Sequence, residues 1–171
     1  MVWEGGLASH GGAIGILTAL FVYARRHPDQ PYLWLLDRVV IVVAFAGVLI
    51  RLGNFFNSEI LGIPADLPWA VIFDRIDDTP RHPAQLYESI AYGTIFMGLY
   101  RFYTRLEART PRGFLFGLFL VSVFGFRFLI EFVKERQAAY GVDLALGVGQ
   151  ILSIPLLILG IVFLVRALWN G

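Results

Sequence analysis

Five long apolar stretches divide this chain and limit what it can fold into. They cover residues 5–24, 34–50, 89–103, 113–133 and 144–165. About 20 helical residues cross the hydrocarbon core of a bilayer, so the first, fourth and fifth stretches are long enough and the other two need flanking residues. The stretches are continuous rather than alternating, which argues against a membrane β-barrel. The sequence therefore predicts an all-α fold, a polytopic membrane helix bundle.

The predicted organisation is a single membrane domain over residues 1–171 with five transmembrane helices. Their expected bounds are about 8–24, 34–50, 88–104, 113–133 and 144–166. Residues 52–87, between the second and third helices, contain Gly62, Pro64 and Pro68 and are expected to form a small extracytoplasmic lobe. Within that lobe, residues 71–73 are β-branched or aromatic and predict a short edge strand.

Composition agrees with a membrane protein and excludes several classes of function. Of 171 residues, 57% are hydrophobic and only 16% are charged, which is too apolar for an ordinary soluble domain. Cysteine is absent, so the chain supplies no disulfide, thiolate metal ligand or cysteine nucleophile. With a net charge of +1 and no zinc, P-loop or dinucleotide motif, we expect no metal, no cofactor and no nucleic-acid partner.

The distribution of charge predicts the orientation in the membrane. Arginines cluster after the first helix and between the third and fourth, whereas residues 52–88 carry six acids against two arginines. By the positive-inside rule, the arginine-rich connections face the cytoplasm. The lobe and the turn at 134–143 then face outward, as does the N-terminus, and the C-terminus is cytoplasmic. Asp37 and Arg38 are interpreted as charges at the cytoplasmic membrane interface.

A polar segment, residues 51–59, follows the second apolar stretch. Arg51 and Asn54 are three residues apart and share a face if the helix continues. Together with Asn57 and Glu59 they place a guanidinium, two amides and a carboxylate within nine residues. This composition suits the binding of an anion, although a solvated helix end would explain it equally well.

A second polar string, His82-Pro-Ala-Gln-Leu-Tyr-Glu88, closes the lobe and begins the third helix. Glu88 alone is explained by the preference of a carboxylate for the first turn of a helix. His82 and Gln85 beside it exceed what helix capping requires. We therefore interpret His82 and Gln85 as candidate binding residues.

The fourth helix carries two charges inside an apolar stretch. Arg127 and Glu131 are four residues apart, and a charge at membrane depth costs several kcal/mol unless it is paired or hydrated. An ion pair between the two would explain both without any function. The alternative, which we favour, is that they mark a site, and Gln150 near the outer end of the fifth helix is a further candidate.

Ten polar residues from separate segments are all predicted at the outward ends of their helices: His10, Arg51, Asn54, Asn57, Glu59, His82, Gln85, Arg127, Glu131 and Gln150. Such convergence is typical of a site. Two arginines suit a phosphate, because the planar guanidinium matches its oxygens, and histidine and carboxylates can move protons. In a bilayer the phosphate is most naturally that of a phospholipid.

The motifs themselves resemble those of the bacterial prolipoprotein diacylglyceryl transferases. The resemblance covers the whole chain and rests on five motifs in the family's order: His10-Gly-Gly-x-x-Gly15, Arg51-x-Gly-Asn-Phe-x-Asn-x-Glu59, His82-Pro-x-Gln-Leu-Tyr-Glu88, Arg127-x-x-x-Glu131-Phe and Gly149-Gln150-Ile-Leu-Ser153. It implies that a diacylglyceryl group moves from phosphatidylglycerol to the lipobox cysteine thiol of a prolipoprotein, releasing glycerol-1-phosphate. It also implies a site in the bacterial inner membrane that faces the outer leaflet. The positions that match residues used by the family are His10, Arg51, Asn54, Glu59, Gly62, Arg127 and Glu131.

From this resemblance we expect Arg51, Arg127 and His10 to be catalytic. The two arginines would hold the phosphodiester and stabilise the charge of the leaving phosphate. His10 is the candidate base for the thiol, although a histidine can equally bind phosphate. The substrate-binding residues would be Asn54, Asn57, Glu59, Gly62, His82, Gln85, Glu131 and Gln150, with Glu131 positioning Arg127.

Two departures from the family pattern lead to alternatives. Full-length members begin with further N-terminal helices, so we expect this chain to be N-terminally truncated and question whether it is active alone. Ile50 and Ser58 also stand where the family usually has glycine. The alternatives are an inactive fragment of the transferase, or a non-enzymatic phospholipid-binding module or transporter. The absence of an internal repeat speaks against a transporter.

Overall fold

The computed structural model describes residues 9–106, 110–135 and 146–169, with the side chains of residues 9 and 10 left out. Within these ranges it contains five α-helices, which confirms the all-α prediction. They are α1 (Ser9–Arg26), α2 (Tyr32–Phe56), α3 (Ala84–Leu106), α4 (Phe114–Ile130) and α5 (Val148–Trp169). A short 3₁₀ helix, η2 (Glu131–Val133), continues α4. The part of the predicted outer turn that follows residue 135 lies outside the described residues.

Three of these helices are long and apolar enough to cross a membrane: α2, α4 together with η2, and α5. The chain is therefore a membrane protein, but the structure does not confirm five spans. Both remaining helices carry more polar sequence. Helix α1 ends on Arg25 and Arg26, while α3 has Glu88 near its start and Arg105 in its last turn.

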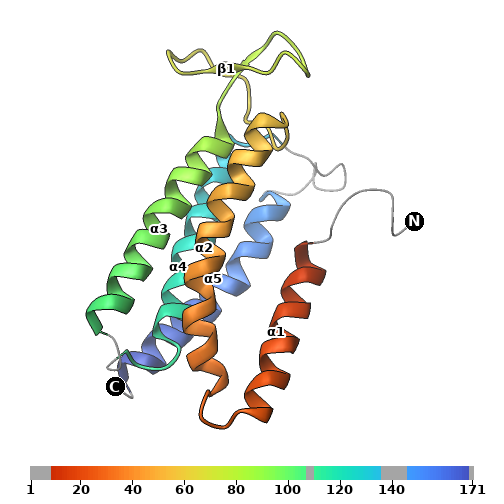
Figure 1. Ribbon diagram of the computed structural model, residues 1–171. Helices are drawn as coiled ribbons and strands as arrows, with labels where there is room; N and C mark the ends of the chain where they lie inside the picture. Colours follow the sequence, from red (N-terminus) through yellow and green to blue (C-terminus); the bar gives the residue numbers. More distant parts are fainter. Residues whose placement is uncertain (1–8, 107–109, 136–145, 170–171) are drawn as a thin grey trace.

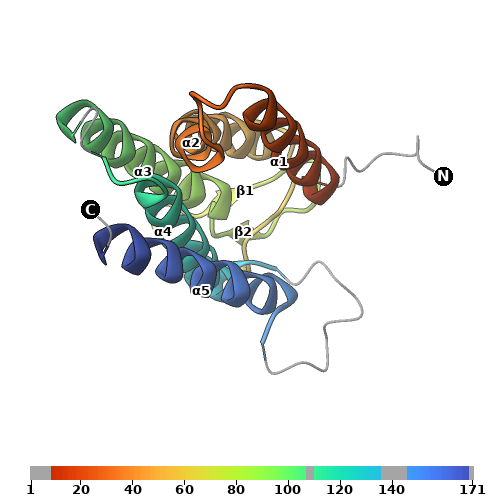
Figure 2. The same ribbon diagram turned by 90° about the horizontal axis from the view of Figure 1, so that it is seen from below.

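The helices lie side by side in a bundle (Figure 1). Seen along the bundle, α4 lies between α3 and α5, and α2 lies beside α3, with α1 at the edge next to α2 (Figure 2). The buried core joins three of them through Val40, Ile41, Ala44, Leu99 and Leu115. Burial of these apolar side chains fixes the relative positions of the helices that carry the polar ends.

Helix α2 is longer than its apolar stretch and continues past Ile50 to Phe56. Arg51 and Asn54 therefore lie within the last turns of α2 itself and not in the segment that follows the helix. Arginine and leucine are good helix formers, so polarity alone does not stop the helix here. A Cβ at Gly53 would contact nothing within 4 Å, so this glycine does not mark a close approach.

Asp37 is more than an interface charge, which corrects the sequence interpretation. Its carboxylate is only 3% exposed and accepts hydrogen bonds from the backbone N–H groups of Gly113, at 2.6 Å, and Phe116, at 2.8 Å. These N–H groups begin α4 and have no partner within that helix. A residue of α2 therefore caps α4, a contact between residues far apart in the sequence.

The lobe between α2 and α3 contains one two-stranded antiparallel sheet in the described part of the chain. Strand β1 (Val71–Ile72) pairs with β2 (Pro80–Arg81), which agrees with the strand predicted at 71–73. The lobe is fastened to the end of α4 by backbone hydrogen bonds. Ile63 N donates to Val133 O at 3.0 Å, and Glu135 N donates to Leu61 O at 2.9 Å.

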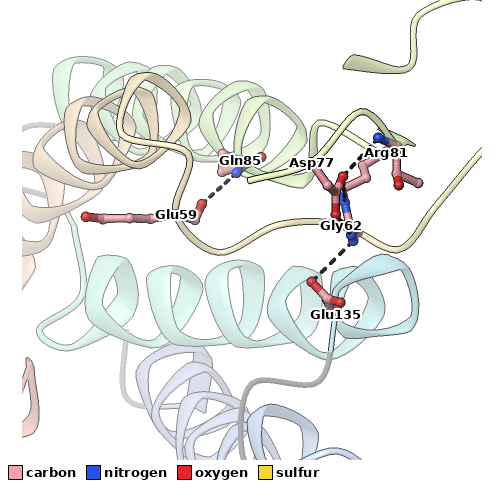
Figure 3. A network of polar contacts seen from close by, with 7 residues as sticks. Glu59, Gly62, Asp77, Arg81, Gln85 and Glu135 are labelled. Atoms are coloured by element: carbon pink, nitrogen blue, oxygen red, sulfur yellow. Dashed lines mark hydrogen bonds and ion pairs between the residues drawn. The ribbon is translucent and has the colours of Figure 1, made fainter. Parts of the chain in front are cut away.

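The buried side chain of Arg81 also joins the lobe to the segment after α4 (Figure 3). It is 7% exposed, and its Nη2 lies 2.7 Å from Asp77 Oδ2 while its Nη1 lies 3.3 Å from Glu135 Oε2. The second contact joins the lobe to the segment that follows α4. Hydrogen bonding by Arg81 is the main cause that lowers the pKa of Asp77 from its ordinary value of 3.8 to about 2.

We expect the lobe to loosen as the pH falls through this range. Because the pKa of Asp77 is lower in the folded chain, its stabilising contribution is complete above about pH 3.8 and is lost as the pH falls through about 2. The change would be measured as the amide protection factors of residues 61–81, obtained by hydrogen exchange between pH 5 and pH 2. This range covers the titration of the Asp77 carboxylate. Asp77→Asn should exchange faster at the higher pH and show a weaker pH dependence. An unchanged pH profile in this variant would contradict the assignment.

Candidate functional site

Arg51, on the last turns of α2, lies at the centre of the polar contacts. Its Nη1 donates a hydrogen bond to Asn54 Oδ1 at 3.4 Å, and its Nε lies 3.3 Å from Glu88 Oε2 on α3. The guanidinium also lies over the Tyr92 ring, 6.0 Å from the centroid. The side chain is 11% exposed, so its position is set by protein contacts on several sides.

Glu88 joins Arg51 to a second cation. It is fully buried, and its other oxygen, Oε1, lies 3.6 Å from Lys134 Nζ. Neither oxygen accepts a hydrogen bond with good geometry from the described residues. Glu88 is thus a buried carboxylate held by charge from both sides, and it connects α2, α3 and the segment after α4.

Lys134 is almost as deeply buried, at 9% exposure. Burial lowers the pKa of Lys134 below its ordinary value of 10.5, and the positive charges of Arg51 and Arg127 lower it further. The negative charges of Glu88 and Glu131 act in the opposite direction. Arg127 therefore lies within electrostatic range of the same lysine as Arg51. Both arginines therefore act electrostatically on Lys134, which is itself a third cation.

The alternative explanation of Arg127 and Glu131, an ion pair between the two, does not hold, because no salt bridge joins these two described residues. Glu131 instead lies 4.0 Å from Lys134, and its carboxylate packs where a Cβ on Gly149 would be. The α-helix ends at Ile130 and a 3₁₀ turn begins at Glu131. The tighter turn changes the direction of this side chain, and the start of α5 favours a negative charge. Glu131 therefore does not position Arg127 by direct contact.

Glu59 continues the network toward the lobe. Asn54 Nδ2 donates to Glu59 Oε2 at 2.7 Å, and the fully buried Gln85 donates from Nε2 to the Glu59 carbonyl at 2.6 Å (Figure 3). The resulting chain of contacts runs through Glu59, Asn54, Arg51, Glu88, Lys134 and Glu131.

The backbone around Glu59 is strained. Ser58 and Ile60 have positive φ angles, 58° and 59°. This left-handed conformation costs about 1–2 kcal/mol for a residue with a Cβ. At Ser58 the family resemblance leads one to expect glycine, and the structure supplies the reason, because glycine adopts this conformation freely.

Two other predicted site residues, His82 and Gln150, make no direct contact with Arg51 among the described residues. His82 Nδ1 lies 3.4 Å from the Tyr87 hydroxyl, which also accepts a hydrogen bond from Trp69. Gln150 is buried, donates to Phe128 O at 3.3 Å and accepts from Gly147 N at 2.9 Å, so it joins α5 to α4.

The last three predicted site residues are Asn57, Gly62 and His10. Asn57 is exposed at the end of α2. At Gly62 a Cβ would overlap the carbonyl oxygen of His82, so the chain passes there only without a side chain. His10 lies in the first turn of α1, and its side chain falls outside the described ones.

A cavity of about 390 Å³ opens beside Lys134. Its polar lining comes from Glu131, Lys134, Glu135 and Gln150, and its apolar lining includes Ile63 and Phe132. This volume lies within the range of small-ligand sites. The cavity brings together residues from the lobe, the end of α4 and the start of α5.

Sequence reasoning missed Glu88 and Lys134 as members of the site. Glu88 was explained as a helix-capping carboxylate, and Lys134 was assigned to a turn. A signal existed for the lysine, because residues 127, 131 and 134 follow the i, i+4, i+7 spacing of one helical face. For Glu88 the signal was its spacing from Gln85 and Tyr92, which places all three on one face of α3.

The chain matches the family model for prolipoprotein diacylglyceryl transferase over residues 1–166. It is 54% identical to the phosphatidylglycerol--prolipoprotein diacylglyceryl transferase of Chloroherpeton thalassium, over 97% of this chain and 62% of that protein. The proteins of the same name from Tolumonas auensis and Bacteroides fragilis are 51% and 44% identical, over 95% and 93% of this chain. The chain thus spans less than two thirds of the length of these relatives. No solved structure matches it.

We expect Glu88→Gln to destabilise the bundle strongly. The substitution removes the counter-charge of Arg51 and leaves Lys134 with only Glu131, 4.0 Å away. Breaking a buried ion pair in this way costs about 3–5 kcal/mol. Thermal unfolding of the purified chain in detergent would measure the loss. Glu88→Gln combined with Lys134→Met should regain part of it, because one unpaired cation is then removed.

The matched control is Glu59→Gln, which changes the same charge at an exposed position. It should cost less than about 1 kcal/mol, as expected for an exposed contact. Equal destabilisation by Glu59→Gln and Glu88→Gln would contradict the central role of the buried carboxylate.

Proposed function

The chain belongs to the prolipoprotein diacylglyceryl transferase family, and we propose that it acts in the transfer of a diacylglyceryl group from phosphatidylglycerol to a prolipoprotein. The acceptor is the thiol of the lipobox cysteine, and the reaction is the first step of lipoprotein maturation. The observation that carries the proposal is the buried linkage of Arg51 and Lys134 through Glu88, with Arg127 within electrostatic range of the same lysine. Such a cluster of cations fits the phosphate of a phospholipid headgroup.

In this proposal Arg51 and Arg127 hold the phosphodiester of phosphatidylglycerol. The network around Arg51 supports the assignment, because Glu88 and Asn54 fix its guanidinium before substrate binds. A fixed cation stabilises developing negative charge without having to reorganise. Lys134, which shares Glu88 with Arg51, adds positive charge to the same region.

The proposed reaction is a displacement at the glyceryl carbon of phosphatidylglycerol. The cysteine thiolate supplies the electron pair of the new carbon–sulfur bond, and the carbon–oxygen bond to the phosphate breaks. Glycerol-1-phosphate leaves with that electron pair, and its negative charge is stabilised by the two arginines. These contacts strengthen as the charge on the phosphate grows, which is the requirement for lowering the barrier.

His10 is the proposed base that takes the proton from the thiol. A cysteine thiol is mostly protonated at neutral pH, whereas histidine accepts protons in that range. The remaining proposed substrate contacts are Asn54, Asn57, Glu59, Gly62, His82, Gln85, Glu131 and Gln150. In the structure Asn54 contacts Arg51, Glu59 contacts Asn54, and Gln85 binds the Glu59 carbonyl. We therefore expect these residues to position Arg51.

The proposed setting is the bacterial inner membrane. The chain forms one membrane domain over 1–171 with five transmembrane helices, the lobe outside the cytoplasm and the C-terminus inside. Supporting this, the lobe and Arg51 share one end of the bundle, and Arg105 and Arg112 lie near the other (Figure 1). The positive-inside rule assigns that other end to the cytoplasm.

Replacing the arginines tests the phosphate role. We expect Arg127→Lys to lose most lipidation of a lipobox peptide, by about a hundredfold, since lysine keeps the charge but not the planar two-point contact. Arg51→Lys should behave alike. The assay mixes purified protein, phosphatidylglycerol and peptide, and follows the mass increment of a diacylglyceryl group. It is run with this chain and with a full-length relative that carries the same substitutions.

Arg105→Lys is the matched control, because it changes an exposed arginine at the other end of α3. It should retain normal activity. If Arg127→Lys kept most of its activity, charge alone would suffice and the two-point contact would be wrong. A full-length relative that lipidates the peptide, beside a wild-type chain that does not, would favour the fragment reading for this chain.

The absence of cysteine allows a direct test of topology. Cysteine introduced at Asp74, an exposed residue of the lobe, should react in intact cells with a thiol reagent that does not cross membranes. Cysteine at Arg105 should react only after the cells are opened. The opposite pattern would invert the orientation.

A further inference from the structure

A second cavity lies at the opposite end of the bundle from Arg51, where α2 and α4 begin and α3 ends (Figure 1). Its volume is about 670 Å³. We call it the Arg38 cavity, and its polar lining includes Trp34, Asp37, Arg38, Tyr103, Thr104 and Arg112. None of these residues has a role in the proposed transfer reaction.

Arg38 is held in place within this cavity by aromatic contacts. Its guanidinium lies 3.4 Å from the centroid of the Trp34 ring and 5.5 Å from that of Tyr103. Its Nη1 donates a hydrogen bond to the Trp34 carbonyl at 2.9 Å. The other nitrogens of this planar group stay available as donors in a fixed orientation, which is what two-point binding of a phosphate needs.

The cavity also has an excess of positive charge. No ion pair within the described residues involves Arg38 or Arg112. The carboxylate in the lining, Asp37, is committed to the backbone N–H groups of Gly113 and Phe116. An anion entering the cavity therefore meets two guanidinium groups and one carboxylate whose oxygens already accept backbone hydrogen bonds.

From this arrangement we propose that the Arg38 cavity binds the headgroup of an anionic phospholipid of the leaflet at that end. The cavity lies at the ends of membrane-crossing helices, at the depth where headgroups lie. Tryptophan and tyrosine prefer that interface, and basic pockets between helices bind anionic headgroups there. The lipid would bridge α2, α3 and α4 on the face opposite to the transfer site.

Native mass spectrometry of the detergent-solubilised chain, titrated with phosphatidylglycerol or phosphatidylcholine, tests the proposal. We expect two bound phosphatidylglycerol molecules in the wild type. Arg38→Gln with Arg112→Gln should weaken one of them by about tenfold or more, the order expected for a lost charge-assisted hydrogen bond. Phosphatidylcholine should bind about equally weakly to the wild type and to this variant.

Two further variants separate this inference from the proposed function. Arg51→Gln with Arg127→Gln should lose the other lipid and keep the one at Arg38. Arg105→Gln, which removes the same charge at the same end without lining the cavity, should keep both. Arg38→Lys keeps the charge but loses the stacked planar group, so it serves if the double variant fails to fold, and it should weaken binding severalfold.

Several results would overturn the inference. One is unchanged binding of both lipids by Arg38→Lys and by the double variant; another is an equal loss in Arg105→Gln. Displacement of the lipid by inorganic phosphate at similar concentration would show a site for small anions instead. A further contrary result is loss of both lipids in the Arg51 and Arg127 double variant with no loss in the Arg38 and Arg112 double variant. Both lipids would then bind at the transfer site.

Discussion

The lobe end of the structure depends on the ion pairs made by the buried carboxylate of Glu88. It lies on α3 between Arg51 of α2 and Lys134 after α4, and none of the three partners is more than 11% exposed. Each cation would be costly to bury alone, and so would the carboxylate. The three charges therefore hold one another, and they fix three chain segments at a common point.

The lobe depends on the same point from the other side. Gly62 pairs with Lys134 in an isolated β-bridge, and Arg81 reaches Glu135 one residue further on. The segment after α4 thus contacts Glu88 through a side chain and the lobe through its backbone. The lobe is therefore connected to Arg51 through Lys134 and Glu88.

The two ends of the bundle use charge differently. At the lobe end, Arg51 and Lys134 flank a buried carboxylate, and Lys134 also lines a cavity of about 390 Å³. At the other end, Asp37 caps α4, which leaves Arg38 stacked on aromatic rings in the Arg38 cavity. Between them lies an apolar core in which the described helices α2, α3 and α4 contribute Val40, Leu99 and Leu115.

The sequence by itself determined the helical class and the resemblance to the family, and it named Arg51, Asn54 and Glu59, which the structure joins by hydrogen bonds. Hydrophobic length and local spacing are properties of the chain alone, which is why these predictions were accessible. Only the tertiary structure decided the pairing. Glu131 packs against α5 and not against Arg127, because a 3₁₀ turn follows Ile130. Glu88 is a buried bridge between two cations rather than a helix cap, and Asp37 caps a helix far along the chain. Such partners depend on which helices pack together, and that is set by the whole core rather than by any single segment.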